Sequence, residues 1–446
     1  MASLVSNEFQ NYAPASNLLQ NEQIRNLMES GIRIYHFGFG QSPFPVMETA
    51  VEALQENAGQ NAYLPVTGLP ELRQGIADFH VRYDGISVDP GDIIVGPGSK
   101  ELIFLLLRVF QGDIIVISPS WTTYKPQIIL ARHTPHIIHT SMSTDWKITP
   151  ESLSMFLEAN NLSKNKLLIL NNPDNPTGTS YSESELQELS KIFRENNILV
   201  LSDEIYARLR FDQGHFSIAK VYPEGTILSS GLSKWASAGG WRLGYHIYPP
   251  GLSELREAVR SGASHTYTCA AAPIQYASVK MLKDVSGCHD YILHTTRIMG
   301  VVSDFCYREL TSIGVKALKP TAGYYIFPDF AILRDKLRQY GIDTCEQMCE
   351  AMLEECSVAV IAGGPAFLRP LDELTVRLCF VNFDGTKALC ESRKNGLQAK
   401  LQDNFILEHC RPVYEGIQVL SIKFLIWLVF INGAFTSFHS LGPHLF

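Results

Sequence analysis

Short apolar runs alternate with helical patterns through the first half of the chain. Five runs have the length and composition of buried strands: residues 92–95, 113–117, 166–170, 198–202 and 226–230. Residues 99–110 and 182–196 have helical patterns, and Ser182 with Glu185 matches a capping box. This alternation predicts an α/β fold with a mainly parallel sheet, to which residues 242–248 add a further strand.

The pattern changes after residue 285, where longer helices and few strands follow. The strands expected there are residues 324–327, 358–361 and 376–380. This change predicts a second, smaller α+β domain. The expected organisation is an N-terminal arm (1–45), a large domain (46–285), a small C-terminal domain (286–410) and an apolar tail (411–446).

The tail is very apolar, but its uninterrupted part covers only residues 424–431. A membrane-spanning helix needs about twenty residues, so a membrane anchor is the weakest of three alternatives. The others are a helix packed on the small domain and a poorly ordered extension. We expect a tail that lies on the surface or packs loosely and is dispensable for chemistry, with no membrane partner.

Composition narrows the class of protein. The chain has 446 residues, 18% of them charged, and a net charge of −8, which is typical of a globular protein and gives no basic surface for nucleic acid. The nine cysteines form no CxxC pair, so we expect reduced thiols and no metal site. The N-terminus lacks the features of a secretory signal, and we expect a cytoplasmic protein.

Two segments place reactive side chains after strands. Lys234 lies among small residues in SSGLSKWASAGGWRLGY, at a carboxyl edge of the predicted sheet, where ligands bind in such folds. A lysine there can form a Schiff base with an aldehyde if its pKa is lowered, although a solvated surface lysine is the simpler interpretation of this residue alone. Asp203 follows the predicted strand at residues 198–202, in the segment SDEIYARL. Its side chain suits a cationic partner or a helix N-cap, and the adjacent Glu204 is expected to point the opposite way.

Two turn-rich segments could hold polar ligand groups. The loop NNPDNPTGT contains Asn175, whose amide could donate to a ligand. In VGPGSKELIF, the helix that begins after Gly98 could bind a phosphate with its first N–H groups. Neither GxxxxGK[ST] nor GxGxxG occurs, so nucleotide-binding motifs are absent. Each segment taken alone is also compatible with an ordinary turn.

Taken together and in order, these segments resemble the class I/II aminotransferases of fold type I, the aspartate aminotransferase superfamily. The resemblance covers residues 37 to 383. It includes FGFGQSPFP, with an extra Ser42 before Pro43, and continues through AYLPVTGLPELRQGIADF, NPDNPTG, SDEIY, SKWASAGGWRLGY and VRLCF. It implies a large domain with a mainly parallel seven-stranded sheet, a smaller α+β domain, and pyridoxal phosphate (PLP) as the cofactor.

The resemblance implies a role for each matching residue. Lys234 would hold PLP as a Schiff base and move protons, and Asp203 would pair with the ring nitrogen. Asn175 and Tyr206 would bind the ring oxygen, and Trp121 would stack on the ring. Arg377 would bind the substrate carboxylate, which Gly40 lets the arm approach. Tyr63 would reach the phosphate of a neighbouring subunit, which implies a homodimer. The phosphate would be bound by Gly98, Ser99, Lys100, Ser233 and Arg242.

The reaction that the resemblance favours is transfer of an amino group between an L-amino acid and a 2-oxo acid. An ACC-synthase-like elimination and a C–S β-lyase reaction use the same lysine and ring contacts, so the motifs leave them open. A PLP-binding regulator without catalytic activity is the third alternative. Gly231 stands where some family members have a phosphate-binding serine, so Ser229 or Ser233 is expected to replace it.

Overall fold

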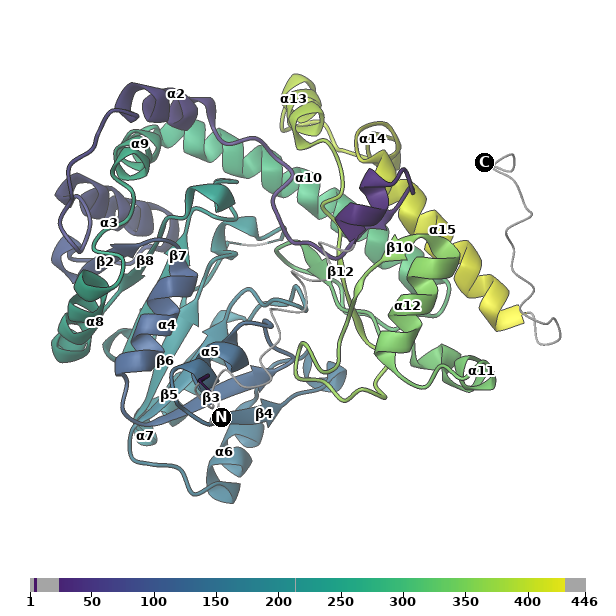
Figure 1. Cartoon of the computed structure of the whole chain (residues 1–446), viewed down its shortest axis with the longest axis horizontal. Helices are drawn as coiled ribbons and strands as arrows, with labels where there is room; N and C mark the ends of the chain where they lie inside the picture. The colour runs from purple at the N-terminus through teal and green to yellow at the C-terminus, as the bar shows by residue number, and fades with distance from the viewer. Residues whose placement is uncertain (1–3, 6–23, 213, 430–446) are drawn as a thin grey trace.

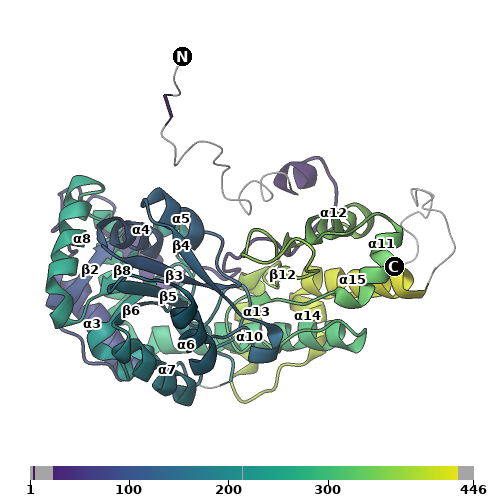
Figure 2. The same ribbon diagram turned by 90° about the horizontal axis from the view of Figure 1, so that it is seen from below.

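The computed structural model describes residues 4–5, 24–212 and 214–429, and one long helix, α10 (Val285–Ser312), connects its two parts. Figure 1 shows a sheet surrounded by helices on one side of the molecule and a smaller group of helices and short strands on the other. The two parts lie side by side in the perpendicular view (Figure 2). We propose that the boundary between the large and the small domain lies near residue 285, because α10 begins there.

A seven-stranded sheet forms the centre of the large domain, in the order β2-β8-β7-β6-β5-β3-β4. All neighbours are parallel except β8, which runs antiparallel to both β2 and β7. The mainly parallel sheet expected from the sequence is therefore confirmed. The strands are β2 (Ile93–Gly96), β3 (Asp113–Ser118), β4 (Pro135–His139), β5 (Lys166–Asn171), β6 (Ile198–Asp203), β7 (Thr226–Gly231) and β8 (Gly244–Ile247).

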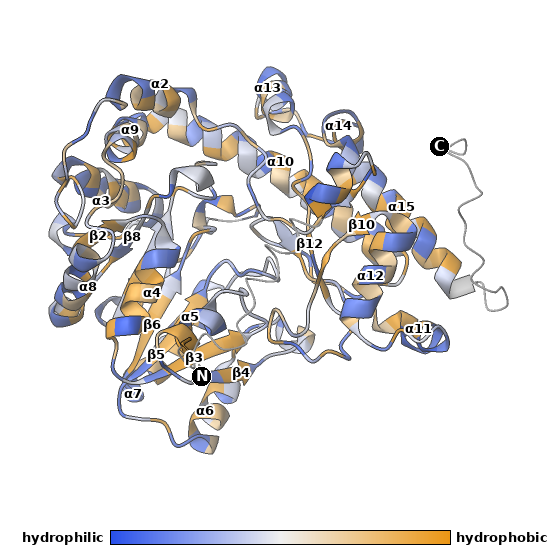
Figure 3. Cartoon of the chain, viewed as in Figure 1, coloured by the Kyte–Doolittle hydropathy of each residue, from blue (hydrophilic) through white to orange (hydrophobic). Residues whose placement is uncertain are grey.

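Alternate residues of the central strands pack against two different helical layers. In β3, Ile114 and Val116 contact the layer of α4, α5 and α8, whereas Ile115 contacts the layer of α6 and α7. Because both faces are buried, these strands are continuous apolar runs, which Figure 3 shows in orange. The helices of this domain are α2 (Glu48–Asn57), α3 (Pro70–Asp84), α4 (Ser99–Val109), α5 (Tyr124–Leu130), α6 (Pro150–Ala159), α7 (Glu183–Glu195), α8 (Ser253–His265) and α9 (Ala272–Lys283).

Two small sheets organise the second domain. One is antiparallel, in the order β11-β12-β9, and the other pairs β1 with β10 in parallel. The expectation of a single strand at residues 358–361 is wrong, because two short strands form there. The first, β10, pairs with β1 of the arm, and the second, β11, pairs with β12. The strands are β1 (Tyr35–His36), β9 (Tyr325–Ile326), β10 (Val358–Ala359), β11 (Ile361–Ala362) and β12 (Val376–Cys379).

Helices complete the small domain: α11 (Arg334–Gln339), α12 (Cys345–Cys356), α13 (Gly385–Asn395), α14 (Asp403–His409) and α15 (Arg411–Val429). The three cysteines of α12 are buried, and all nine cysteines of the chain are free thiols. Among the described residues, no group of three or more His, Cys, Asp or Glu side chains could hold a metal ion. The arm joins this domain through Ile24 and Ile34, which pack with Ala359.

The expectation of a loosely packed tail is wrong for residues 411–429, which form α15. Its side chains at spacings of three and four residues are buried against the small domain: Val413, Ile417, Leu420, Phe424 and Trp427. Lys423 Nζ also lies 2.8 Å from Glu355 Oε2 of α12. Residues 430–446 lie outside the described part of the chain. Within the described ranges, no helix has both the length and the apolar character that a membrane crossing requires.

The packing of α15 predicts a stability difference between neighbouring apolar residues. Phe424 is 1% exposed and Leu425 is 46% exposed. Phe424→Ala should lower the free energy of unfolding by about 3 to 5 kcal/mol, because it leaves a cavity in a packed core. Leu425→Ala, the matched control, should change it by about 0.5 kcal/mol or less. Urea unfolding measures both, and equal effects of the two substitutions would show that α15 is not part of the core.

Candidate active site

A cavity of about 540 Å³ lies at the carboxyl ends of β5, β6 and β7, and strands β9 and β12 of the small domain contribute to its wall. The arm also contributes, through residues 39–41. Two of the site residues predicted from the sequence, Gly98 and Tyr63, do not line the cavity. All the others line it: Gly40, Ser99, Lys100, Trp121, Asn175, Asp203, Tyr206, Ser233, Lys234, Arg242 and Arg377.

Asp203 is the only aspartate or glutamate among the described residues that line this cavity. The parallel register pairs Asn171 of β5 with Asp203 of β6, so both side chains reach the same edge of the sheet. Tyr124 donates a hydrogen bond to Asp203 Oδ2 over 2.7 Å. Burial raises the pKa of Asp203 to about 6, partly offset by the Tyr124 hydrogen bond. The carboxyl group is thus ionised near neutral pH, in a desolvated position suited to a cationic partner.

Glu204 points away from the cavity, as expected for the residue next to Asp203. Its carboxylate is buried behind the strand, where Oε1 accepts hydrogen bonds from Ser202 (2.8 Å) and Ser217 (2.6 Å). Its Oε2 lies 2.7 Å from Nε2 of His215. These contacts satisfy Glu204, so a pair of carboxylates acting on one bond is excluded.

Lys234 extends into the cavity from the turn that follows β7. Its Nζ donates a hydrogen bond to the carbonyl of Gly40 over 2.6 Å, and the side chain lies near the rings of Tyr206 and Tyr324. Burial lowers the pKa of Lys234 to about 8. A substantial fraction of the amine is therefore neutral and nucleophilic at slightly alkaline pH.

Gly40 has no room for a side chain, because a Cβ atom there would collide with Oη of Tyr325. The arm therefore approaches the lysine and the small domain as closely as its backbone allows.

Cationic and N–H groups gather at another part of the cavity wall. Gly98, with φ of +95°, caps α4, and a Cβ atom there would collide with the guanidinium of Arg242. Partial burial and the nearby charge of Arg242 lower the pKa of Lys100. Neither Lys100 nor Arg242 is paired with a carboxylate in the described part of the chain. Together with the start of α4, they form a place suited to a dianion.

Of the two serines considered as replacements at Gly231, Ser233 lines the cavity and Ser229 does not. The hydroxyl of Ser229 is buried and has no hydrogen-bond partner among the residues that the structure describes. Ser233 is therefore the serine that can reach a bound ligand.

Arg377 of β12 is buried without a counter-ion among the described residues. Its Nη2 donates to the carbonyl of Gly38 over 2.7 Å, and its Nη1 donates to Oδ1 of Asn175 over 3.2 Å. Its Nε makes no hydrogen bond within the described part of the chain. A desolvated guanidinium with only neutral acceptors has the charge and the free donors to bind a carboxylate.

Aromatic rings form another part of the cavity wall. Trp121 lies edge-on to Tyr124, with ring centroids 5.2 Å apart, and the Lys100 ammonium lies 5.1 Å from the Trp121 ring centroid. The hydroxyl oxygens of Tyr206 and Tyr325 are 2.8 Å apart. Burial, and to a smaller extent the neighbouring Tyr325, raises the pKa of Tyr206 well above its usual value, so this phenol stays protonated.

Sequence reasoning missed four polar residues of the cavity: Gln41, Asn171, Tyr124 and Tyr325. Asn171 is the first residue of NNPDNPTGT and binds the backbone of Asp203 and Asn175, so its position after a strand was an available signal. Tyr124 and Tyr325 belong to a short helix and a two-residue strand, which have no such signal. Tyr63, in contrast, is 87% exposed and lies outside the cavity of this single chain.

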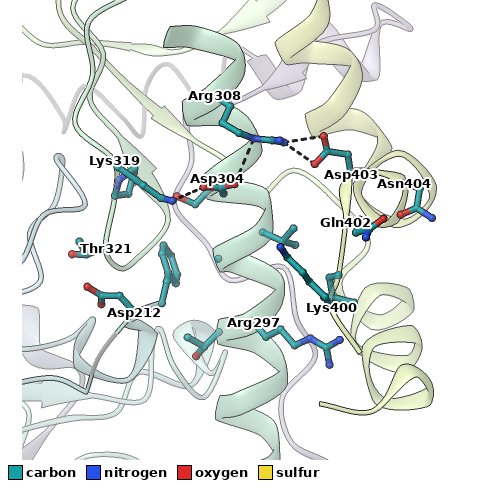
Figure 4. A pocket seen from close by; sticks show the side chains of 17 residues that line it. Asp212, Arg297, Asp304, Arg308, Lys319, Thr321, Lys400, Gln402, Asp403 and Asn404 are labelled. Atoms are coloured by element: carbon teal, nitrogen blue, oxygen red, sulfur yellow. Dashed lines mark hydrogen bonds and ion pairs between the residues drawn. The ribbon is translucent and has the colours of Figure 1, made fainter. Parts of the chain in front are cut away.

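A larger cavity of about 1020 Å³ lies between α10 and the segment that leads into α14 (Figure 4). Two ion pairs lie on its wall: Arg308 with Asp403 at 2.7 Å, and Lys319 with Asp304 at 2.5 Å. Its two lysines, Lys319 and Lys400, are exposed, and Asp212 pairs with Arg210, so this surface lacks the buried acid and the desolvated lysine of the first cavity.

Comparison with known proteins agrees with the geometry. The family model of aminotransferase class I and II matches residues 32–392. An aspartate aminotransferase from Bacillus sp. (strain YM-2) is 32% identical over 376 residues, covering 82% of this chain and 92% of the relative. An aspartate aminotransferase from Thermotoga maritima is 33% identical over 336 residues, covering 74% of this chain and 81% of the relative.

Solved structures give the same result. The structure of aspartate aminotransferase from Thermus thermophilus with maleate has a TM-score of 0.77 and 26% identity, and the match covers 89% of this chain and 99% of that one. The structure of an aromatic aminotransferase from Pyrococcus horikoshii OT3 has a TM-score of 0.73 and 26% identity, and the match covers 90% of this chain and 99% of that one. The lyase, elimination and regulator alternatives are not favoured by these relatives. The chain therefore belongs to the class I and II aminotransferases, PLP-dependent enzymes that move an amino group between an amino acid and a 2-oxo acid.

Proposed function

We propose that this cavity binds PLP and the two substrates of amino transfer, with Lys234 as the covalent anchor and the proton carrier. One observation carries the proposal. Among the described residues, a lysine with its pKa lowered to about 8 shares a cavity with a single buried carboxylate and with cationic side chains that pair with no carboxylate. Those groups match the aldehyde, the protonated ring nitrogen, the phosphate and the substrate carboxylate that PLP chemistry requires.

The residues fit the cofactor group by group. Asp203 would face the ring nitrogen, and Asn175 and Tyr206 would face the ring oxygen. Trp121 would cover one face of the ring. The phosphate would be bound by the N-terminus of α4 at Gly98 and by Ser99, Lys100, Ser233 and Arg242. A bound PLP supplies the electron sink that stabilises negative charge at the substrate Cα.

The protein would supply orientation and proton transfer. Arg377 would hold the substrate carboxylate with its forked donors, and the close approach of the arm at Gly40 would keep water away from it. The neutral amine of Lys234 would remove the proton from the substrate Cα and hold it for return to the reacting group. Its lowered pKa keeps enough of the amine neutral for this role.

A homodimer is part of the proposal. Tyr63, between α2 and α3, is 87% exposed, which is unusual for an aromatic side chain. Lys100 and Arg242 are also exposed in the single chain, so the phosphate end of the cavity is open. Tyr63 from a second copy would close that end and add a hydroxyl donor. We also propose a cytoplasmic location, because free thiols are typical of proteins in a reducing compartment.

The anchor role predicts the site of a covalent label. Borohydride reduction of the holoenzyme should fix the cofactor to Lys234, and peptide mapping should recover the label there. Lys234→Ala should lower the rate of amino transfer by at least about a thousandfold, because the anchor and the proton carrier are both lost. Lys100→Ala is the control, since it removes the other lysine of the cavity and should leave the label on Lys234. Recovery of the label on Lys100 in the wild-type protein would refute the assignment.

Asp203 should make cofactor binding depend on pH. Because its pKa is raised to about 6, the carboxylate is charged above that pH and loses its charge as the pH falls below it. The affinity of the apoprotein for PLP should therefore weaken as the pH falls through 6, more steeply than the titration of free PLP explains. Equilibrium dialysis of wild type and Asp203→Asn in the same buffers isolates this contribution. If the two proteins show the same pH profile, Asp203 does not face the ring nitrogen.

Arg377→Lys should raise the KM for amino acids by about a hundredfold, because an ammonium cannot make the forked contact with a carboxylate. Cofactor content, measured by absorbance, should remain normal. Arg194→Lys is the control, because Arg194 forms an ion pair with Glu224 at the surface. Loss of cofactor with retained substrate affinity would contradict the proposed role of Arg377.

A further inference from the structure

Ser42, the extra residue of the arm, begins a chain of hydrogen-bonded hydroxyl groups. Its Oγ lies 2.6 Å from Oγ of Ser237, and Oγ of Ser237 lies 2.6 Å from Oη of Tyr291. Tyr291 then donates to the carbonyl of Pro45 over 2.8 Å. The chain therefore leaves the arm at Ser42 and returns to it at Pro45.

The direction of this chain is fixed by its last member. A carbonyl oxygen only accepts, so the single proton of Tyr291 goes to Pro45. Tyr291 must then accept the proton of Ser237, and Ser237 must accept the proton of Ser42. Because each hydroxyl has one proton to donate, the three side chains act as a unit, and linked hydroxyl groups strengthen one another in a buried position.

The unit fastens the arm to two other parts of the molecule. Ser237 belongs to the turn of the reactive lysine, where its N–H donates to the carbonyl of Lys234 over 3.2 Å. Its backbone has φ of +55°, a conformation that a serine rarely adopts without supporting contacts. Tyr291 lies on α10, is 1% exposed, and holds the far end of the chain in the core.

The same stretch of arm contacts the lysine amine. Two residues before Ser42, the carbonyl of Gly40 accepts the hydrogen bond from Lys234 Nζ over 2.6 Å. Gly40 also lies directly against Tyr325, so a small movement of the arm changes both contacts. The position of Ser42 thus controls the backbone that faces the substrate side of the cavity.

We propose that Ser42, Ser237 and Tyr291 form a positioning relay that holds the arm against the lysine turn and thereby sets the affinity for the amino acid. The inference rests on the proposed roles of Lys234 and Gly40 in amino transfer. None of the three relay residues touches the reacting atoms, so they act through the arm. Without the relay, the arm would keep β1, the Arg377 contact at Gly38 and the Lys234 contact at Gly40, but Ser42 and Pro45 would lose the hydrogen bonds that fix the stretch beyond Gly40.

The test compares Ser42→Ala and Tyr291→Phe with two matched controls. Ser278→Ala removes a buried hydroxyl that donates to the carbonyl of Ile274, and Tyr222→Phe removes one that donates to the carbonyl of Ile198. In the apoprotein, hydrogen exchange of the arm amides at residues 38–42 and 44 should quicken about tenfold in each relay variant, the effect of losing one hydrogen bond. In the holoenzyme, KM for the amino acid should rise about tenfold while kcat changes by less than about threefold.

Further readouts separate the relay from a general loss of packing. The controls should change neither arm exchange nor KM. The double variant Ser42→Ala/Tyr291→Phe should raise KM by less than the product of the two single effects, because the two hydroxyls belong to one chain. Unchanged arm exchange in both relay variants overturns the relay itself. Faster exchange with unchanged KM, or equal KM changes in the controls, overturns its positioning role. A failure of the proposed function would appear separately, as wild-type protein without a label on Lys234.

Discussion

The parallel register of β5, β6 and β7 is the constraint on which the site depends. It ends three strands at one edge of the sheet and pairs Asn171, Asp203 and Ser229 in a row across it. Asn171, Asp203 and, just after β7, Lys234 therefore reach one cavity without any long loop having to fold over the sheet. The register is itself fixed by burial, because a shift of one residue would turn every apolar side chain of these strands to the wrong layer.

Charge burial is the second constraint, and it opposes stability. Arg377 is buried among neutral acceptors, and Asp203 is buried with its pKa raised to about 6. Both arrangements cost free energy unless an opposite charge faces them, and a bound anion or cation provides that charge. The site therefore suits ligands that bring opposite charges to two fixed positions, which is the charge pattern of the PLP and the amino acid that we propose it binds. The same burial gives Lys234 its lowered pKa, so affinity and reactivity have a common origin.

The sequence was sufficient to predict which residues line the cavity where their placement depends on local structure. Lys234, Asp203 and Asn175 each follow an apolar strand, and strand ends are visible as a change from apolar to turn-forming residues. Tyr124 and Tyr325 could not be found this way, because their roles arise from tertiary contacts of short elements. The packing of α15 was misjudged for a related reason. Its buried stripe is regular, but apolar residues such as Ile422 and Leu425 interrupt the polar face, and the resulting run resembles an unstructured apolar tail.

The two domains meet at the lysine, and this explains why the arm matters. The large domain supplies the lysine turn, and the small domain supplies Tyr324, which donates to the carbonyl of Lys234 over 2.9 Å. The arm pairs with the small domain through β1 and Gly38 accepts a hydrogen bond from Arg377, while Gly40 contacts the lysine. A backbone segment tied to both domains transmits any change in their relative position directly to the amine and the guanidinium. The substrate binding proposed for Arg377 and the proton transfer proposed for Lys234 would therefore be mechanically connected through residues 38–40, although the two side chains come from different domains.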